Sequence, residues 1–439
     1  MPVLPSAPLA SLNAAHGAFV RRYPGDGGRR QPVHVVYGGA HRFAADTAKK
    51  LGALARAALE TYAPDEGTFG RALGLSPAVS ERVYPRVAEK LKREPVEDFR
   101  IDFEDGYGHR ADPEEDGHAV AAAEALAAGL RQGLLPPFMG LRVKPLSGEL
   151  APRALRTLDL FLGRMVSRTG GVLPSHFVVT LPKVTSPEQV RALCEVLAAH
   201  EGTFKLEPGS LGLEVMVETP QCLVAPDGRM MLPQLLDAAG ERLRAAHFGT
   251  YDFTAALDVT AAHQSMRHPH ADLAKGMMKL AFAGTGVMLS DGATTLLPAA
   301  PHKGEKLTAK QRAENRKVVH RAWRQSASDI RHSLVNGFYQ GWDLHPAQLP
   351  ARFGAVYAFF LEGFDAARER LAGFVEQLGQ AKLTRDVFDD AATGQGLLNF
   401  FLRGINCGAI TEEDAAATGL SLEELRSKSF AAIAKARRG

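Results

Sequence analysis

Short apolar runs alternate with longer helical stretches along most of the chain. β-branched and aromatic residues are concentrated in eight runs, at residues 34–39, 99–104, 138–144, 176–184, 211–219, 246–252, 287–291 and 337–345. The runs are followed by stretches rich in Ala, Leu and Arg, in which apolar positions recur at helical spacing. Strands that alternate with helices predict a parallel sheet of the α/β class.

The polar residues favour closure of this sheet into a barrel over a doubly wound open sheet. In a barrel the C-terminal ends of all strands meet at one mouth, whereas an open sheet spreads them along an edge. We therefore predict a (β/α)8 TIM barrel over residues 34–350. Most predicted strands end in charged or polar residues, namely Asp102, Glu104, Asp105, Arg142, Lys144, Lys183, Glu218, Asp252, Asp291 and His345.

Three segments lie outside this repeating pattern. Residues 1–33 precede the barrel, and residues 64–97 interrupt it after the first helix as an insertion with short helices of its own. Residues 351–439 predict a purely α-helical C-terminal extension. Amphipathic patterns in the extension predict helices over 351–378, 397–403 and 422–437. Such a tail can cap the barrel or mediate assembly, and we expect a homo-oligomer.

Composition excludes several classes of partner. The 439 residues are 45% hydrophobic and 23% charged, which is enough to build a large core, and the net charge is only +3. Basic and acidic residues are interspersed, so the sequence predicts neither a nucleic-acid nor a membrane partner. The N-terminus does not resemble a signal peptide and no apolar run approaches ~20 residues, so we expect a cytoplasmic protein. The cysteines, Cys194, Cys222 and Cys407, predict neither a disulfide framework nor a zinc site.

Two acidic residues at neighbouring strand ends are the first candidates for chemistry. Glu218 ends the apolar run EVMVE, and Asp252 follows a glycine in HFGTYD. A carboxylate that leaves an apolar strand is costly unless it is paired or bound to a metal. Two such acids with open positions for water and substrate suit Mg²⁺ or Mn²⁺. Pairing of each acid with an arginine or lysine at the mouth is an equal alternative.

Two basic residues complement these acids. Arg142, in GLRVKP, can present a planar fork of donors to a carboxylate or phosphate. Lys183, in TLPKV, can add a point charge near the same anion, or serve as a Schiff-base amine. Either residue can instead pair with the acidic cluster DFEDG at residues 102–106.

The DFEDG cluster holds three carboxylates, which raise one another's pKa unless cations intervene. On a strand, Asp102 and Glu104 share a face and Asp105 begins the loop. The cluster can provide a general base, orient water near a metal, or pair with arginine. Other motifs are weaker: the histidine-rich loop 263–270 lacks zinc spacing, Gly284-Thr285-Gly286 lacks a dinucleotide fingerprint, and neither GxxxxGK[ST] nor GxSxG occurs.

Seven motifs together resemble a known superfamily. DFEDG, LRVKP, LPKV, VETP, FGTYD, SDG and GWDLHPAQ follow one another in the order and approximate spacing of the HpcH/HpaI aldolase and citrate lyase β-subunit-like proteins. The resemblance covers roughly residues 34–350, and GWDLHPAQ, similar to the family's G-W-x-I-H-P-x-Q, is the most specific motif. The long helical tail marks a divergent branch.

The resemblance implies a (β/α)8 barrel with Mg²⁺ that cleaves and forms carbon–carbon bonds through an enolate. By the family pattern Glu218 and Asp252 resemble the metal ligands, and Arg142 resembles the residue that grips the substrate carboxylate. Glu104 and Asp105 resemble the acidic pair near the metal-bound water. The segment that receives a 2-oxo acid is implied at Gly249, Thr250 and Tyr251, and a CoA or carrier-protein thioester is a possible second partner.

Departures from the family pattern leave the substrate open. Lys144 stands where asparagine is usual, the insertion and tail are not part of the family core, and the tail is in a position to cover the entrance for a thioester. We therefore expect a metal-dependent lyase or aldolase acting on a 2-oxo acid or related thioester. A phosphotransfer enzyme that uses phosphoenolpyruvate through Arg142, Lys144 and Lys183, and a catalytically silent barrel that serves in binding or assembly, are the alternatives.

Overall fold

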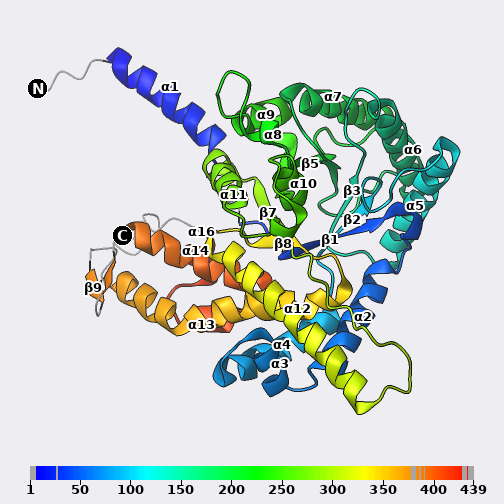
Figure 1. Cartoon of the computed structure of the whole chain (residues 1–439). Coiled ribbons are helices and arrows are strands. Elements are labelled where there is room, and N and C mark those ends of the chain that lie inside the picture. The colour runs from blue at the N-terminus through cyan, green and yellow to red at the C-terminus, as the bar shows by residue number, and fades with distance from the viewer. Residues whose placement is uncertain are drawn as a thin grey trace, which may run out of the picture.

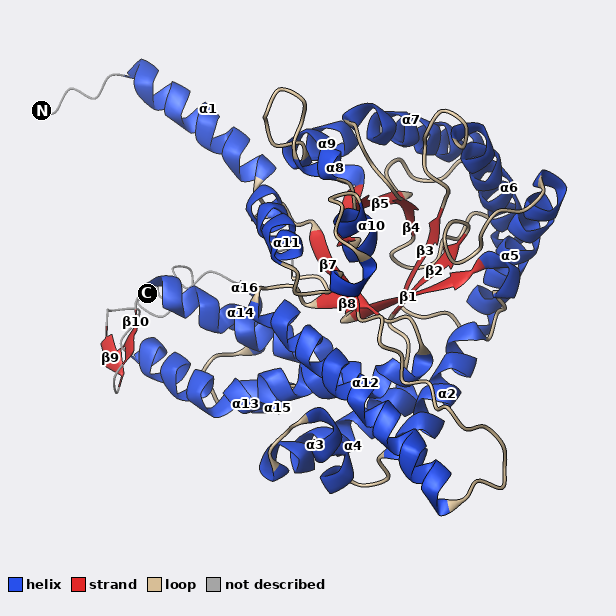
Figure 2. Ribbon diagram, in the orientation of Figure 1, coloured by secondary structure: helices blue, strands red, loops and turns tan. Residues whose placement is uncertain are grey.

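The chain forms a closed barrel of eight parallel strands, as Figure 2 shows in red. The computed structural model describes residues 6–25, 28–376, 382–384, 387–389, 391–427 and 433. Each strand pairs with its neighbour in sequence, and β1 also pairs with β8 to close the ring. The predicted fold class is confirmed. The strands are β1 (His34–Gly39), β2 (Asp98–Asp102), β3 (Phe138–Arg142), β4 (Val178–Leu181), β5 (Gly212–Val217), β6 (Leu243–Phe248), β7 (Met288–Ala293) and β8 (Gln340–Trp342).

Helices follow every strand and form the outer layer of the barrel (Figure 1). Several begin with a proline in the first turn, where its missing N–H leaves no hydrogen bond unmade. The helices between strands are α2 (Thr47–Tyr62), α3 (Glu66–Leu73), α4 (Pro77–Arg93), α5 (Asp112–Gln132), α6 (Ala151–Thr169), α7 (Pro187–Phe204), α8 (Pro220–Leu223), α9 (Leu232–Ala239), α10 (Thr250–Ala255), α11 (Pro269–Phe282) and α12 (Ala309–Val335), with short 3-10 turns at Ala40–Arg42, Gly240–Arg242, Ala261–His263 and Pro346–Gln348.

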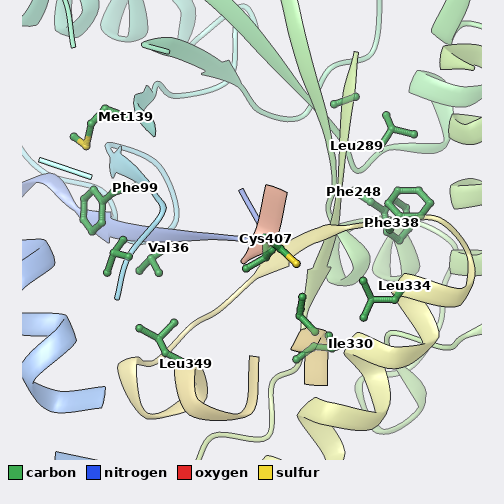
Figure 3. Packing of buried hydrophobic residues seen from close by; sticks show 14 of the residues in the cluster. Val36, Phe99, Met139, Phe248, Leu289, Ile330, Leu334, Phe338, Leu349 and Cys407 are labelled. Atoms are coloured by element: carbon green, nitrogen blue, oxygen red, sulfur yellow. The ribbon is translucent and has the colours of Figure 1, made fainter. Parts of the chain in front are cut away.

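The outward faces of the strands carry the apolar residues that hold the helical layer. Val36, Phe99 and Met139 stand in register on β1, β2 and β3, and all three are buried. In Figure 3 they gather on one side of the sheet, while Ile330 and Leu334 of α12 approach from the helical layer. Burial of such side chains contributes roughly 1.5–3 kcal/mol each.

The inward faces carry charged and polar residues instead of a purely apolar filling. Along β2, apolar Phe99 and Ile101 alternate with Asp98, Arg100 and Asp102, because successive side chains of a strand point to opposite faces. All five residues are at most 3% exposed. The barrel interior therefore contains buried charged side chains, and each needs a hydrogen-bonding or ionic partner within the protein because burial removes it from water.

The insertion and the tail pack against each other outside the barrel. The insertion supplies helices α3 and α4, which lie between α2 and β2 in the sequence. Helix α4 packs against α13 (Leu349–Glu376) of the tail. Helix α13 also packs against α12 and α14 (Ala391–Cys407). The expectation that the chain beyond residue 350 is only helical is wrong, because β9 (Lys382–Thr384) and β10 (Val387–Asp389) form an antiparallel pair. These runs are too short to show a strand period. Helices α15 (Glu412–Ala416) and α16 (Leu422–Ser427) follow. Beyond α16, the helix predicted over 422–437 lies outside the described residues, except for residue 433. Residues 377–378 of the helix predicted over 351–378 also lie outside them.

The described part of the tail reaches the N-terminal end of the barrel. Arg403 of α14 donates to Gln31, which precedes β1, over 2.9 Å, and its guanidinium lies 4.9 Å from the ring centre of Tyr339, which precedes β8. These contacts lie opposite the mouth that the tail was expected to cover. The N-terminal segment forms α1 (Ser6–Arg22), which extends away from the barrel in Figure 1, and its residues 1–5 lie outside the described part. Within the described residues no helix is long and apolar enough to cross a membrane.

Candidate active site at the mouth of the barrel

The two predicted metal ligands stand on neighbouring strands at the mouth. Glu218 directly follows β5, and Asp252 lies in the first turn of α10 after β6, which pairs with β5. Glu218 is 1% exposed, and burial together with the negative charge of Asp252 raises its pKa to about 7. Burial also raises the pKa of Asp252. No described arginine forms an ion pair with either acid. The alternative of pairing with a lysine is realised for Asp252, whose carboxylate lies 3.9 Å from the Lys183 ammonium.

Lys183 is the cation at the centre of this acidic group. Its ammonium contacts Glu104 and lies 3.4 Å from Asp105 and 3.9 Å from Asp252. Its backbone N–H donates to Glu218 over 2.7 Å, in a left-handed conformation with φ of 50°. Burial works against the charged amine, but these carboxylates outweigh it and raise the pKa of Lys183. The protonated form is therefore favoured, which supports the point-charge role over the Schiff-base role.

Glu104 and Asp105 are adjacent in sequence but differ in exposure and in the direction of their pKa shifts. Glu104 is 8% exposed, and burial raises its pKa despite the nearby Arg142. The side chain of Asp105 is 58% exposed; partial burial opposes its charge, but a hydrogen bond with Glu104 and the charge of Arg142 lower its pKa. A pair of acids whose pKa values are pushed apart is typical of sites that move a proton.

Arg142 is held beneath the cluster. It donates to both oxygens of Asp102, over 2.7 and 2.6 Å, and lies 3.1 Å from Glu104. Its guanidinium lies over the rings of Tyr37 and Trp342, at 4.8 and 5.5 Å from their centres, and is 1% exposed. The alternative of pairing with the acidic cluster is thus realised in the structure. Binding of the substrate carboxylate by Arg142 stays a prediction.

The predicted 2-oxo acid segment follows β6. Gly249 donates to the carbonyl of Val217 over 3.0 Å, and a Cβ on Gly249 would stand 2.5 Å from the carboxylate of Glu218. The glycine is therefore needed for the close approach of Glu218. Thr250 is 1% exposed, and the Tyr251 hydroxyl donates to the carbonyl of Ala293 over 2.7 Å. Contact of this segment with a ligand stays a prediction.

The donor set at the mouth suits a hard divalent cation. Acids outnumber bases there, and Glu218 has no cationic side chain in direct contact among the described residues. No group of three or more potential ligands arranged around a metal position occurs in the described part of the chain. A cation held by Glu218 and Asp252 would complete its shell with water and substrate oxygens, as Mg²⁺ does. The charged side chains of the mouth are Asp102, Glu104, Asp105, Arg142, Lys183, Glu218 and Asp252.

Two residues expected at the mouth are used elsewhere. Asp291 lies on the outer face of β7, where it accepts from Lys275 over 3.1 Å and from Ser333 over 2.6 Å. Its placement at the mouth was wrong because its position on the strand faces α11 and α12. Lys144 is buried and donates to Glu115 of α5 over 2.7 Å.

A second charged layer lies deeper in the barrel and was not predicted. Arg100 pairs with Asp98 and also with Glu214, over 3.1 Å. Glu214 accepts from Thr180 over 2.7 Å, and the buried His247 accepts a hydrogen bond from Tyr37 or donates to it, over 3.0 Å. The alternation of charged and apolar residues in DFRIDFE at residues 98–104 was the signal that could have found this layer.

Comparison with known proteins decides the family. The profile described as "Domain of unknown function (DUF6986)" matches residues 12–433, which is nearly the whole chain. The chain is a member of the DUF6986 family. The matched residues of this DUF6986 protein include the barrel, the insertion and most of the tail. No curated protein is a significant match.

Solved structures share the fold of this DUF6986 protein. A citrate lyase from Burkholderia xenovorans LB400 is similar with a TM-score of 0.58 and 19% identity, over 89% of this chain and 97% of that one. A malate synthase from Haloferax volcanii, in a ternary complex with pyruvate and acetyl-CoA, matches with a TM-score of 0.47 and 14% identity, over 93% and 98%. At 19% identity the citrate lyase match supports the barrel fold alone.

Proposed function

We propose that this DUF6986 protein is a lyase or aldolase that makes or breaks a carbon–carbon bond next to a 2-oxo acid or a related thioester, with Mg²⁺ or Mn²⁺. One observation carries the proposal: Glu218 and Asp252 follow neighbouring strands at the barrel mouth, where neither forms an ion pair with a described arginine and the charge of Asp252 raises the pKa of Glu218. The motifs that resemble the HpcH/HpaI and citrate lyase superfamily support the same chemistry, and the citrate lyase match supports the barrel fold that this chemistry would use.

Glu218 and Asp252 would hold the cation. When bound there, it supplies positive charge beside a keto oxygen, where an enolate develops negative charge. Gly249 leaves the space that Glu218 needs, and the backbone N–H of Lys183 fixes one oxygen of that carboxylate. These two contacts orient Glu218 before any ligand arrives.

Glu104 is the better candidate for the proton-transfer group. Its raised pKa suits a residue that takes and returns a proton. Asp105 remains charged, and together with Glu104 it holds the ammonium of Lys183. Lys183, with a side chain 31% exposed, can shift toward the carboxylate of a substrate.

Arg142 would act on the substrate carboxylate through its remaining donor capacity while Asp102 fixes its plane. The indole N–H of Trp342, which lies beside this guanidinium, is buried and has no described protein partner, so it offers a further donor. Phosphotransfer from phosphoenolpyruvate is less well supported, because the Lys144 ammonium that it requires is paired with Glu115.

Enolisation of a 2-oxo acid can be tested without knowing the second substrate. We expect the protein with Mg²⁺ to exchange the methyl protons of pyruvate, or the methylene protons of oxaloacetate, with deuterium from D₂O, followed by proton NMR. Glu218→Gln and Asp252→Asn should lose the exchange, and the exposed control Asp227→Asn should keep it. Exchange no faster than with Mg²⁺ alone for either compound would contradict the proposal and favour the catalytically silent barrel.

A further inference from the structure

A cationic cavity lies at the opposite end of the barrel, before β7 and β8. It has a volume of about 140 Å³. Three parts of the chain each contribute a basic side chain to its wall: Arg29 from the segment before β1, Lys279 from α11 and Arg403 from α14. Figure 1 shows α11 beside β7 on this side of the barrel.

The described charged side chains that line this cavity are all basic. No described residue that lines it is an aspartate or glutamate. Within the described part of the chain, Arg29 forms no ion pair, and its charge lowers the pKa of the neighbouring Arg244 after the effect of burial. Burial and the charge of Arg403 likewise lower the pKa of Lys279. Cations that repel one another at a protein surface cost free energy, which a bound anion would recover.

Glycines shape the wall of the cavity. Gly284 and Gly286 have φ of 74° and 79°, and the carbonyl of Gly284 accepts from the N–H of Gly25 over 2.8 Å, which fixes the N-terminal segment against this loop. A Cβ on Gly337 would stand 3.0 Å from the Lys279 ammonium, which donates to the Gly337 carbonyl over 2.9 Å. The absence of a side chain at Gly337 therefore leaves space beside the Lys279 ammonium.

We propose that this cavity binds the phosphate group of a small phosphorylated molecule, with Arg29 and Lys279 as its principal contacts. A phosphate presents several oxygens to cations from different directions, and charge-assisted hydrogen bonds of this kind are among the strongest in proteins. The volume fits, because a cavity of about 150 Å³ is known to hold a molecule the size of benzene.

An adjoining cavity offers room for the rest of such a molecule. It has a volume of about 240 Å³ and shares Arg29 and Met288 with the first. Its wall also includes Asp98, Glu214 and Gln340, whose side chains can meet hydroxyl groups. An organic phosphate should therefore bind more tightly than inorganic phosphate.

Calorimetric titration of the full chain, stripped of metal and at fixed ionic strength, tests the site. The ligands are inorganic phosphate, glycerol 3-phosphate and succinate. We expect glycerol 3-phosphate to bind most tightly, and Arg29→Gln and Lys279→Gln each to weaken it about tenfold or more. Bound ligand should also raise the melting temperature, because it binds only the folded chain.

Two variants locate the binding. Arg191→Gln, an exposed position on α7, and Lys183→Gln at the mouth should both bind glycerol 3-phosphate as the wild type does. The proposal is overturned if neither phosphate compound binds, if the Arg29→Gln and Lys279→Gln double variant binds with unchanged affinity while still folded, or if only Lys183→Gln loses binding. Succinate binding as tightly as glycerol 3-phosphate would overturn the preference for phosphate.

Discussion

Two glutamates, one on β5 and one directly after it, show how the same residue type serves two purposes in one barrel. Glu214 and Glu218 are four residues apart, so both face the interior, and each is 1% exposed. Burial opposes the charge of both. At Glu214 the contact with Arg100 outweighs burial and lowers the pKa, whereas at Glu218 the nearby Asp252 adds to burial and raises the pKa to about 7.

The difference lies in the counter-charge and not in the residue type or its exposed fraction. Glu214 lies in the middle of the barrel, within an arginine-centred network that pairs its charge. Glu218 lies at the mouth, where the backbone N–H of Lys183 is its described hydrogen-bond donor. A buried acid that lacks a matching cation is a candidate for binding one, and a buried acid that has one is structural.

Removal of Arg100 should have the largest effect on stability. Arg100→Met leaves Asp98 and Glu214 buried without a counter-charge, and breaking a buried pair in this way costs about 3–5 kcal/mol. Urea unfolding measures the loss. The control Arg191→Met, on the surface, should change the free energy of unfolding by less than about 0.5 kcal/mol. A loss as small as that of the control would show that the deep network does not stabilise the barrel.

Glu218→Gln should stabilise the metal-free protein at alkaline pH. The pKa of Glu218 rises from 4.5 to about 7 on folding, so the folded state binds more protons in this window and wild-type stability falls as the pH increases through it. Glutamine removes this dependence while its carbonyl still accepts from Lys183. The gain at pH 8 should be up to about 3 kcal/mol and should vanish near pH 4. Equal pH profiles for both proteins, measured by urea unfolding with a chelator, would show that Glu218 carries no such penalty.

Lys183→Met should increase the affinity for Mg²⁺, with a smaller change in free energy than the two variants above. The ammonium competes with a metal for the negative charge of Asp252 and Glu104, so its removal should tighten Mg²⁺ binding about tenfold, or about 1.4 kcal/mol. Calorimetric titration with Mg²⁺ measures this. Weaker Mg²⁺ binding in the variant would mean that Lys183 supports the metal site through the loop that it anchors.

The sequence was sufficient for the barrel because strand runs alternate with helical stretches and most of the runs end in polar residues, which favours closure. It was also sufficient to place Glu218, Asp252 and Lys183 at one mouth, because the ends of parallel strands converge. It was insufficient where side-chain direction matters: Asp291 ends a strand run like the others but faces the helices. The partners of Arg142 were undecided for the same reason, since the choice between Asp102 and a substrate depends on distances.

The deep charged layer was not predicted, because its charged residues lie within the strands and not at the strand ends. Asp98 and Arg100 alternate with Phe99 and Ile101, which is the period-two pattern of a strand with one charged face. The cavity at the N-terminal end could not have been predicted, because Arg29 and Lys279 are 250 residues apart and meet only after the ring closes. No local sequence pattern indicates that these two side chains line the same cavity.

Titration of the metal-free protein with Mn²⁺ or Mg²⁺ tests the central claim most directly. We predict a single site in the wild type, and at least about a hundredfold weaker binding in Glu218→Gln and Asp252→Asn, with Asp227→Asn unchanged. The same affinity in the wild type and in both mouth variants, or no binding in the wild type, would contradict the assignment of these two acids.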